Sequence, residues 1–307
     1  MKIAPKMATD ICRVANRKDA APRSKTLLAF LFVSSVVSPS LSGVAAAQSL
    51  DTMPTVTSPF ELPFLPSPSG LWTMTIGGQA ALQPGYEGAK DDKLGVDLIF
   101  GIHRAGSADQ FRSPIDSPSI TLFDLGAFRA GPAVSYVPAR TASNFPALTG
   151  LGDVNATYEV GGFAEYFPFD WVRARVEIRR GFGGSDGVFA DASMDLIVPL
   201  SQRLTWSGGP RLSFANGAAT SPYFSIDAAQ SLASGLPAFD AKAGLQATGA
   251  GSQLRFQVTP QWEAHGYVEY DRLLGDAASS PLVTQQGTAN QVRVGLGASY
   301  SFDFRVR

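Results

Sequence analysis

The chain has 307 residues, and its 25 lysines and arginines nearly balance its 26 aspartates and glutamates. A formal charge of −1 excludes the basic excess that is typical of nucleic-acid-binding proteins. The single cysteine, Cys12, and the two histidines, His103 and His265, lie far apart, and no cluster has metal-ligand spacing. We therefore expect no metal and no cofactor.

Residues 1–47 have the parts of an export signal in the required order. Seven cationic residues lie between Lys2 and Lys25, and the apolar run 27–37 that follows is too short to cross a bilayer. Ala45 and Ala47 then form the Ala-x-Ala pattern that signal peptidase accepts, so we predict cleavage between Ala47 and Gln48. An uncleaved membrane anchor is the alternative. Cleavage would remove Cys12, which would leave no thiol for a disulfide or a lipid anchor.

Residues 48–69 contain five prolines, which remove backbone donors and disfavour both helix and sheet. We interpret this segment as a periplasmic leader. The remaining segment, 70–307, shows alternation of apolar and polar residues with a period of two, which indicates strands rather than helices.

The alternation is most regular near the C-terminus, where every even position from Val292 to Phe304 is apolar or aromatic. The odd positions hold only small, polar or charged residues. Because successive side chains of a strand point to opposite faces, one face of this strand is apolar and the other is polar. Similar segments make about twelve strands in all, with ten or fourteen as the alternatives. They are 71–83, 94–102, 119–125, 127–137, 154–167, 172–179, 188–199, 203–214, 240–249, 253–258, 261–271 and 292–304.

These strands predict an all-β fold, a transmembrane antiparallel β-barrel in the outer membrane of a Gram-negative bacterium. A closed barrel leaves no unpaired strand edge, and a sheet in lipid needs this because lipid cannot hydrogen-bond to free backbone groups. Aromatic residues near the ends of the segments fit interfacial girdles and favour a barrel over a soluble β-sandwich, the alternative. They are Trp72, Tyr86, Tyr136, Tyr166, Phe167, Phe169, Trp171, Trp206, Trp262, Tyr267 and Tyr270. The extra residues Arg305, Val306 and Arg307 displace the terminal aromatic that such barrels usually carry.

One strand face carries a row of charges, Arg173, Arg175, Glu177 and Arg179. A charged side chain facing lipid at mid-bilayer costs roughly 2–4 kcal/mol, so this row is expected to face the barrel lumen. We favour a charge network with acids of the neighbouring strand, Asp191 and Asp195. The alternative is an anion-attracting stripe in a pore.

A hydrolytic barrel is a further hypothesis, because His265 shares its strand face with Glu263 and Glu269. No Gly-x-Ser-x-Gly elbow accompanies this histidine, so we favour a polar lumen ladder and expect no enzyme.

Four motifs occur in order along the barrel segment and resemble one known family. The first is Pro84–Ala89, with Tyr86 and Gly88, and the second is Leu148–Val154, with Gly150, Gly152 and Asp153, followed by Glu159. The third is Ser221–Ile226 followed by Ser234–Pro237. The fourth is Leu273–Val283, with Asp276, Ser280 and Pro281, followed by Gly287, Asn290 and Gln291.

Together these motifs are similar to those of the MipA/OmpV outer-membrane proteins, the first of which is a scaffold that binds a lytic transglycosylase. The resemblance implies a membrane-embedded scaffold for murein-remodelling enzymes, with a lytic transglycosylase and a peptidoglycan synthase as partners. A small-solute porin is the alternative. In this hypothesis the periplasmic turns and the leader contact the partner, and longer loops near 105–118 and 217–238 lie at the cell surface.

The motifs also have a local structural interpretation. Gly150, Gly152 and Asp153 fit a tight turn that requires positive φ. Residues 276–281, which contain small residues and a proline, fit a compact ordered loop instead of a strand. Turn and loop architecture is thus one explanation of the motifs, and a partner-binding surface is the other.

Overall fold

The computed structural model describes residues 69–106 and 111–307. The predicted signal peptide, with its cleavage site between Ala47 and Gln48, and the leader up to residue 68 lie outside the described residues. In the described part, no helix is both long and apolar enough to span a membrane.

Ten long strands and two short ones make up the sheet. The long strands are β1 (Gly70–Pro84), β2 (Asp92–Arg104), β5 (Phe128–Val137), β6 (Thr157–Phe169), β7 (Val172–Gly183), β8 (Val188–Pro199), β9 (Leu204–Ala215), β10 (Gly244–Gln257), β11 (Trp262–Leu273) and β12 (Asn290–Val306). The short strands are β3 (Ser119–Ile120) and β4 (Phe123–Asp124).

The sheet closes into the predicted barrel, with eleven strands in the ring and β4 outside it. β1 pairs with β12 along nearly its whole length, from Gly70 opposite Val306 to Leu82 opposite Val294. The other closure runs through β3, which lies parallel to β2 and antiparallel to β5. A ring of purely antiparallel strands needs an even number, so this one parallel pair is what allows an odd ring to close.

The strands differ from the expected segments in two places. The segments 240–249 and 253–258 belong to one strand, β10, because Gly249 and Gly251 continue the pairing with β11. The segment 119–125 gives only the two short strands, β3 and β4. The total of twelve strands still agrees with the prediction.

The two faces of the barrel wall have the expected polarity. The apolar residues of β12 face outward, and Val292, Val294 and Leu296 are 47%, 50% and 72% exposed. Two aromatic residues assigned to the girdles lie elsewhere. Tyr267 faces the lumen, where its hydroxyl accepts a hydrogen bond from Gln79, and Tyr86 lies in the turn after β1.

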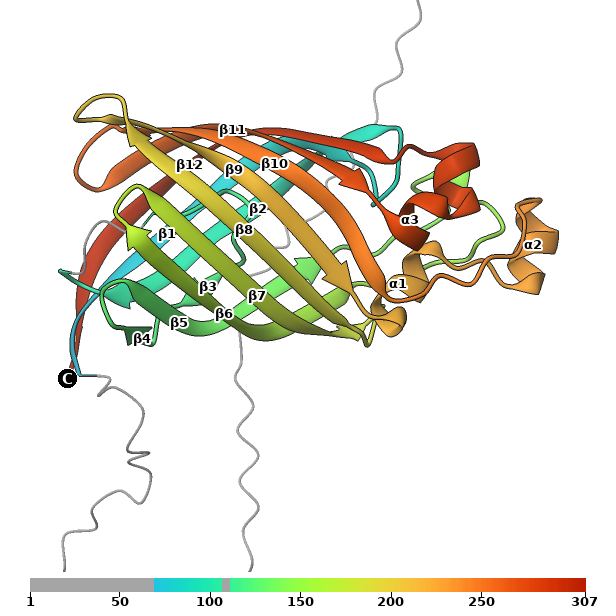
Figure 1. Ribbon diagram of the computed structural model, residues 1–307, viewed down its shortest axis with the longest axis horizontal. Helices are drawn as coiled ribbons and strands as arrows, with labels where there is room; N and C mark the ends of the chain where they lie inside the picture. Colours follow the sequence, from blue (N-terminus) through green and yellow to red (C-terminus); the bar gives the residue numbers. More distant parts are fainter. Residues whose placement is uncertain (1–68, 107–110) are drawn as a thin grey trace, which may run out of the picture. The chain divides into compact units, whose positions relative to one another are not determined.

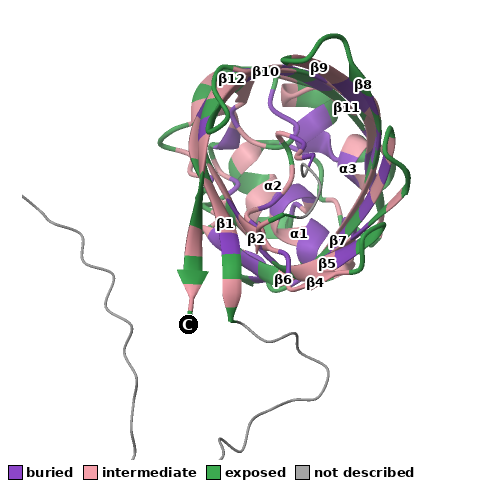
Figure 2. Ribbon diagram, turned by 90° about the vertical axis from the view of Figure 1, so that its left-hand side faces the viewer, coloured by how far each residue is buried: buried purple, intermediate pink, exposed green. Residues whose placement is uncertain are grey.

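The two ends of the barrel are different (Figure 1). At one end, which we call the terminus end, lie the start of β1, the end of β12 and the short turns 170–171, 200–203 and 258–261. At the opposite end, long connections form a cap of short helices. These are η1 (Pro146–Leu148), α1 (Gly217–Phe224), α2 (Ala228–Ser234), α3 (Gly275–Ser279) and η2 (Leu282–Gln286). Seen along the barrel in Figure 2, α1, α2 and α3 lie within the outline of the ring.

Candidate functional site: a filled lumen between a vestibule and a cap

The lumen contains a buried network of ion pairs centred on Arg173, whose side chain is 1% exposed. Its Nε donates to Glu165 at 3.0 Å, its Nη1 to Asp195 at 3.2 Å and its Nη2 to Asp116 at 2.7 Å. Each of these three nitrogens therefore has a carboxylate acceptor in place of water.

The same network extends along β7. Arg175 pairs with Glu165 and Glu177, and Arg179 pairs with Glu159 at 2.8 Å and with Asp191 at 2.6 Å. The charged row therefore faces the lumen and forms the charge network with Asp191 and Asp195 that the alternation suggested. Glu159, one of the motif residues, belongs to this network.

A segment after β2, residues 111–118, which we call the plug, folds into the lumen and contacts several strands of its wall. Its Asp116 carboxylate accepts hydrogen bonds from Arg173 and from the backbone N–H of Ser113, and Ser117 N–H donates to Glu177. Pro114 O accepts a bond from Gln79 at 3.1 Å.

An aromatic contact also holds this plug. The ring of Phe111, 6% exposed, lies beneath two guanidinium groups, those of Arg173 at 5.2 Å and Arg255 at 5.0 Å. Buried cation–π contacts of this kind stabilise by about 2 kcal/mol. The plug is therefore attached to β7 and β10 as well as to β2, where Arg112 donates to Phe100 O at 2.8 Å.

The position of Asp116 changes its acidity. Burial alone would raise the pKa of this carboxyl group. The positive charges of Arg173, Arg175 and Arg112 lower the pKa by more than burial raises it, and the resulting pKa is about 2. Asp116 is therefore charged at every physiological pH, so its ion pairs with Arg173 and Arg175 are retained under those conditions.

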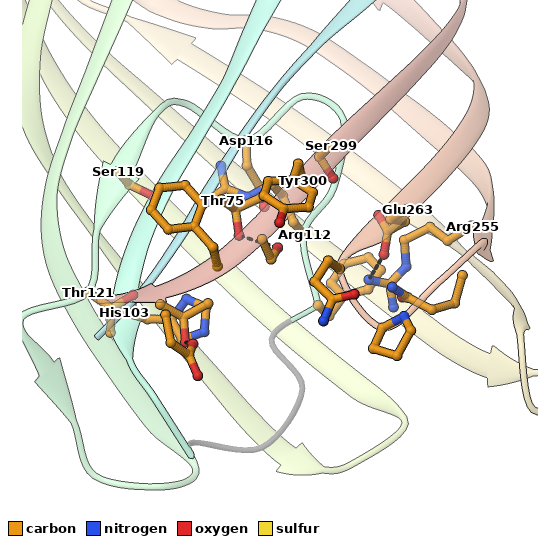
Figure 3. A pocket seen from close by; sticks show the side chains of 18 of the residues that line it. Thr75, His103, Arg112, Asp116, Ser119, Thr121, Arg255, Glu263, Ser299 and Tyr300 are labelled. Atoms are coloured by element: carbon orange, nitrogen blue, oxygen red, sulfur yellow. Dashed lines mark hydrogen bonds and ion pairs between the residues drawn. The ribbon is translucent and has the colours of Figure 1, made fainter. Parts of the chain in front are cut away.

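Between the plug and the terminus end lies a vestibule with a volume of about 710 Å³ (Figure 3). Hydroxyl groups of Thr75, Ser119, Thr121 and Ser299 line its walls, and Arg112 extends into it from the plug. A volume of this size accommodates a small ligand or a short stretch of polypeptide.

His265 is hydrogen-bonded through Nε2 to Gln79 Oε1 at 3.1 Å. This hydrogen-bond partner is a side-chain amide. Within residues 69–106 and 111–307, no group of three His, Cys, Asp or Glu side chains could hold a metal ion.

At the other end, the four motifs meet in the cap around Arg140, which is 6% exposed. Arg140 donates to Tyr223 O at 2.7 Å and to Pro222 O at 3.2 Å, and its guanidinium lies 5.7 Å from the ring centre of Tyr86. Its backbone pairs with Val154. One arginine therefore joins the first, second and third motifs.

Further contacts join the fourth motif to the others. Ser280, fully buried, donates through Oγ to Phe224 O at 2.8 Å. Gly88 N–H donates to Gln291 Oε1 at 3.0 Å, and its φ of +91° excludes most side chains. A Cβ at Gly88 would also lie 2.7 Å from Val283.

The remaining motif residues shape turns of the cap or connect its segments. Gly150 and Gly152 have φ of +85° and +76°, as the expected turn requires, and Asp153 accepts a bond from Ala142 N–H. Residues 275–279 form α3 and not a strand; Asp276 accepts a bond from Lys242 N–H at 2.7 Å, and Pro281 precedes η2.

Sequence reasoning missed Asp116 and Arg140, because each lies in a loop without a periodic pattern. It also placed the longer loops near 105–118 and 217–238 together at the cell surface, which is wrong. The first begins at the terminus end and continues as the plug inside the barrel, whereas the second belongs to the cap at the opposite end. Side-chain partners within the lumen, rather than loop length, decide where the first segment lies.

The family model for MltA-interacting protein MipA matches residues 76–302. The chain belongs to this family. No curated protein matches it. Solved structures similar to this MipA-family chain include the KdgM porin, with 11% identity over 74% of this chain and 99% of that one and a TM-score of 0.36. Another is the COG4313 outer membrane channel from Pseudomonas putida F1, with 10% identity, 82% and 100% coverage and a TM-score of 0.39. The MipA-family chain is an outer-membrane β-barrel.

Proposed function

We propose that this protein is a non-conducting outer-membrane scaffold that docks a murein-remodelling enzyme of the lytic transglycosylase class at its terminus end. The observation that carries the proposal is the plug, because Asp116 and Phe111 bind three lumen arginines across the barrel interior. A barrel filled in this way offers surfaces for binding instead of a pore. The family name, MltA-interacting protein, supports a lytic transglycosylase as the partner class.

The orientation follows from the loops. Outer-membrane barrels have short periplasmic turns and longer extracellular loops. The terminus end, with its short turns and the vestibule, therefore faces the periplasm, where murein lies, and the motif-bearing cap faces outward. In this arrangement β1 begins on the partner's side, residues 48–69 act as a periplasmic leader, and residues 1–47 act as the cleaved signal.

Site-specific photocrosslinking tests the docking surface. A photoreactive residue at Gln261, in the turn beside the vestibule, should form an adduct with a purified lytic transglycosylase. The matched control is Leu232 on α2, which is 90% exposed at the opposite end and should form none. Adducts at Leu232 alone, or none at either position, would remove the scaffold hypothesis.

Planar-bilayer recording separates the scaffold from the porin alternative. The purified barrel should insert without a stable open conductance, because the ion-paired plug crosses the lumen. A stable open channel in the native protein would favour the porin.

A further inference from the structure

One edge of the barrel wall is unpaired. β2 pairs with β1 along its whole length, but on its other side it pairs only with β3, through Gly101 and Ile102. β5, the next long strand, reaches β3 through Ala133. Among the described residues, no strand pairs with residues 92–99 of β2 on that side.

The alternation of a strand identifies the backbone groups concerned. Phe100 O and Ile102 O both point to the β3 side, where they accept bonds from Arg112 and from Thr121 N–H. The N–H and C=O groups of Leu94, Val96 and Leu98 point the same way, toward the unpaired side.

Side-chain exposure agrees with this conclusion at Leu94. Leu94, Val96 and Leu98 are 73%, 75% and 79% exposed, but Val96 and Leu98 lie beside the small residues Ala80 and Gly78, and Leu296 of β12, which has a paired strand on each side and equally small neighbours, is also 72% exposed. Leu94 lies beside Leu82 of β1, so a small neighbour on that side does not explain its exposure.

Unpaired backbone groups at this depth require water. Leu94 lies level with Leu82 and Val294, inside the apolar belt, where lipid cannot hydrogen-bond to the backbone. Water reaches the lumen, because Asp191, which pairs with Arg179 inside the barrel, has a side chain that is 40% exposed. A hollow of about 30 Å³, enough for a water molecule, lies against Leu98.

The lumen side of this edge carries one carboxylate, Asp97, between Val96 and Leu98. None of the ion pairs found among the described residues includes Asp97, whereas Lys93 on the same face lies over the ring of Phe145 at 5.4 Å. The edge thus combines an apolar membrane side with an unpaired negative charge inside.

We propose that the unpaired edge of β2 bounds a hydrated lateral slit that admits a single-chain cationic amphiphile from the bilayer. The alkyl chain lies beside Leu94, Val96 and Leu98, and the ammonium group lies at Asp97. This site lies on the cap side of β3 and is independent of docking at the terminus end.

Hydrogen exchange in lipid nanodiscs tests the slit itself. The amides of Leu94, Val96 and Leu98 should exchange at least tenfold faster than those of Tyr158 and Val160, which lie within β6 between two paired strands. Equal protection in the two strands would show that the edge is closed and would overturn the proposal.

Photolabelling tests the ligand class in the native barrel. Dodecylamine carrying a diazirine should label residues 92–104 in a saturable manner, and dodecanoic acid carrying the same group should not. Asp97→Asn should reduce the saturable labelling at least fivefold, whereas Asp186→Asn, in an exposed turn at the cap end, should leave it unchanged. Equal saturable labelling by the acid, or labelling by the amine without saturation, would overturn the proposal.

Discussion

Arg140 shows how much one residue contributes to the cap. Its two backbone acceptors, Tyr223 O and Pro222 O, belong to the third motif, and its guanidinium lies against Tyr86 of the first. A buried arginine in this position holds three loops together, so its loss should loosen all of them at once.

We predict that Arg140→Met weakens the cap by about 3–6 kcal/mol, because Arg140 donates two hydrogen bonds and each bond from a charged donor contributes about 1.5–3 kcal/mol. Limited proteolysis should then cleave within 138–156 and 216–243 while the barrel stays intact. Lys242→Met is the matched control, since Lys242 is 69% exposed in the same end of the molecule. Identical cleavage of the two variants would contradict the role of Arg140.

The position of a side chain in the fold can be predicted from the sequence for some residues and not for others. Arg173 and Arg179 could be placed in the lumen because they occupy a regular strand whose other face is apolar. Asp116 and Arg140 could not, since their partners lie 57 and 83 positions away in the chain, and no local spacing encodes such contacts.

At the scale of the elements, β3 is the weakest part of the ring, because only two residues join β2 to β5. The alternation of 119–125 predicted one membrane strand there. Pro118 and Pro132 lack backbone donors, but the sequence could not show that they lie beside the same short strand, where Ser119 pairs with Ala133. The longer strands carry many alternating residues each, so their existence was predictable.

We predict that Gly131→Ala disrupts the closure through β3, because a Cβ at this position would lie 1.8 Å from Ile120 O. Overpacking of this kind costs about 1–3 kcal/mol. On a gel, a folded barrel and an unfolded barrel migrate differently. The temperature at which the Gly131→Ala barrel changes from the folded to the unfolded migration should be lower than for the native protein. Gly78→Ala is the control: its Cβ would lie 3.7 Å from the nearest atom, so its transition should stay near that of the native protein. Equal shifts in both variants would refute the importance of β3.

At the scale of the whole molecule, the closed barrel and its polarity followed from the sequence, whereas its contents did not. The period-two pattern reports which face of each strand meets lipid, and closure into a barrel pairs the backbones of such strands, here with the exception of residues 92–99 on one side of β2. The pattern carries no information about what fills the lumen, because both a water-filled pore and a plugged barrel have polar inner faces.

The plug gives the molecule a defined dependence on pH. The folded pKa of Asp116, about 2, lies below its ordinary value of 3.8, so the stabilisation is complete above about pH 4 and is lost as the pH falls through 2. Hydrogen exchange of residues 111–118, corrected for the intrinsic rate, should therefore stay constant from pH 8 to pH 5. It should accelerate below pH 4.

Asp116→Asn removes the charge at every pH and should release the plug already at pH 7. Ser113→Cys, in a position that is 2% exposed and in a barrel segment without other cysteines, reports the release by its reaction with a water-soluble maleimide. The reaction should be slow with Asp116 present and at least tenfold faster with asparagine, because the guanidinium of Arg173 then loses its shortest charged contact. An unchanged rate would mean that Phe111 and the backbone contacts hold the plug without the ion pair.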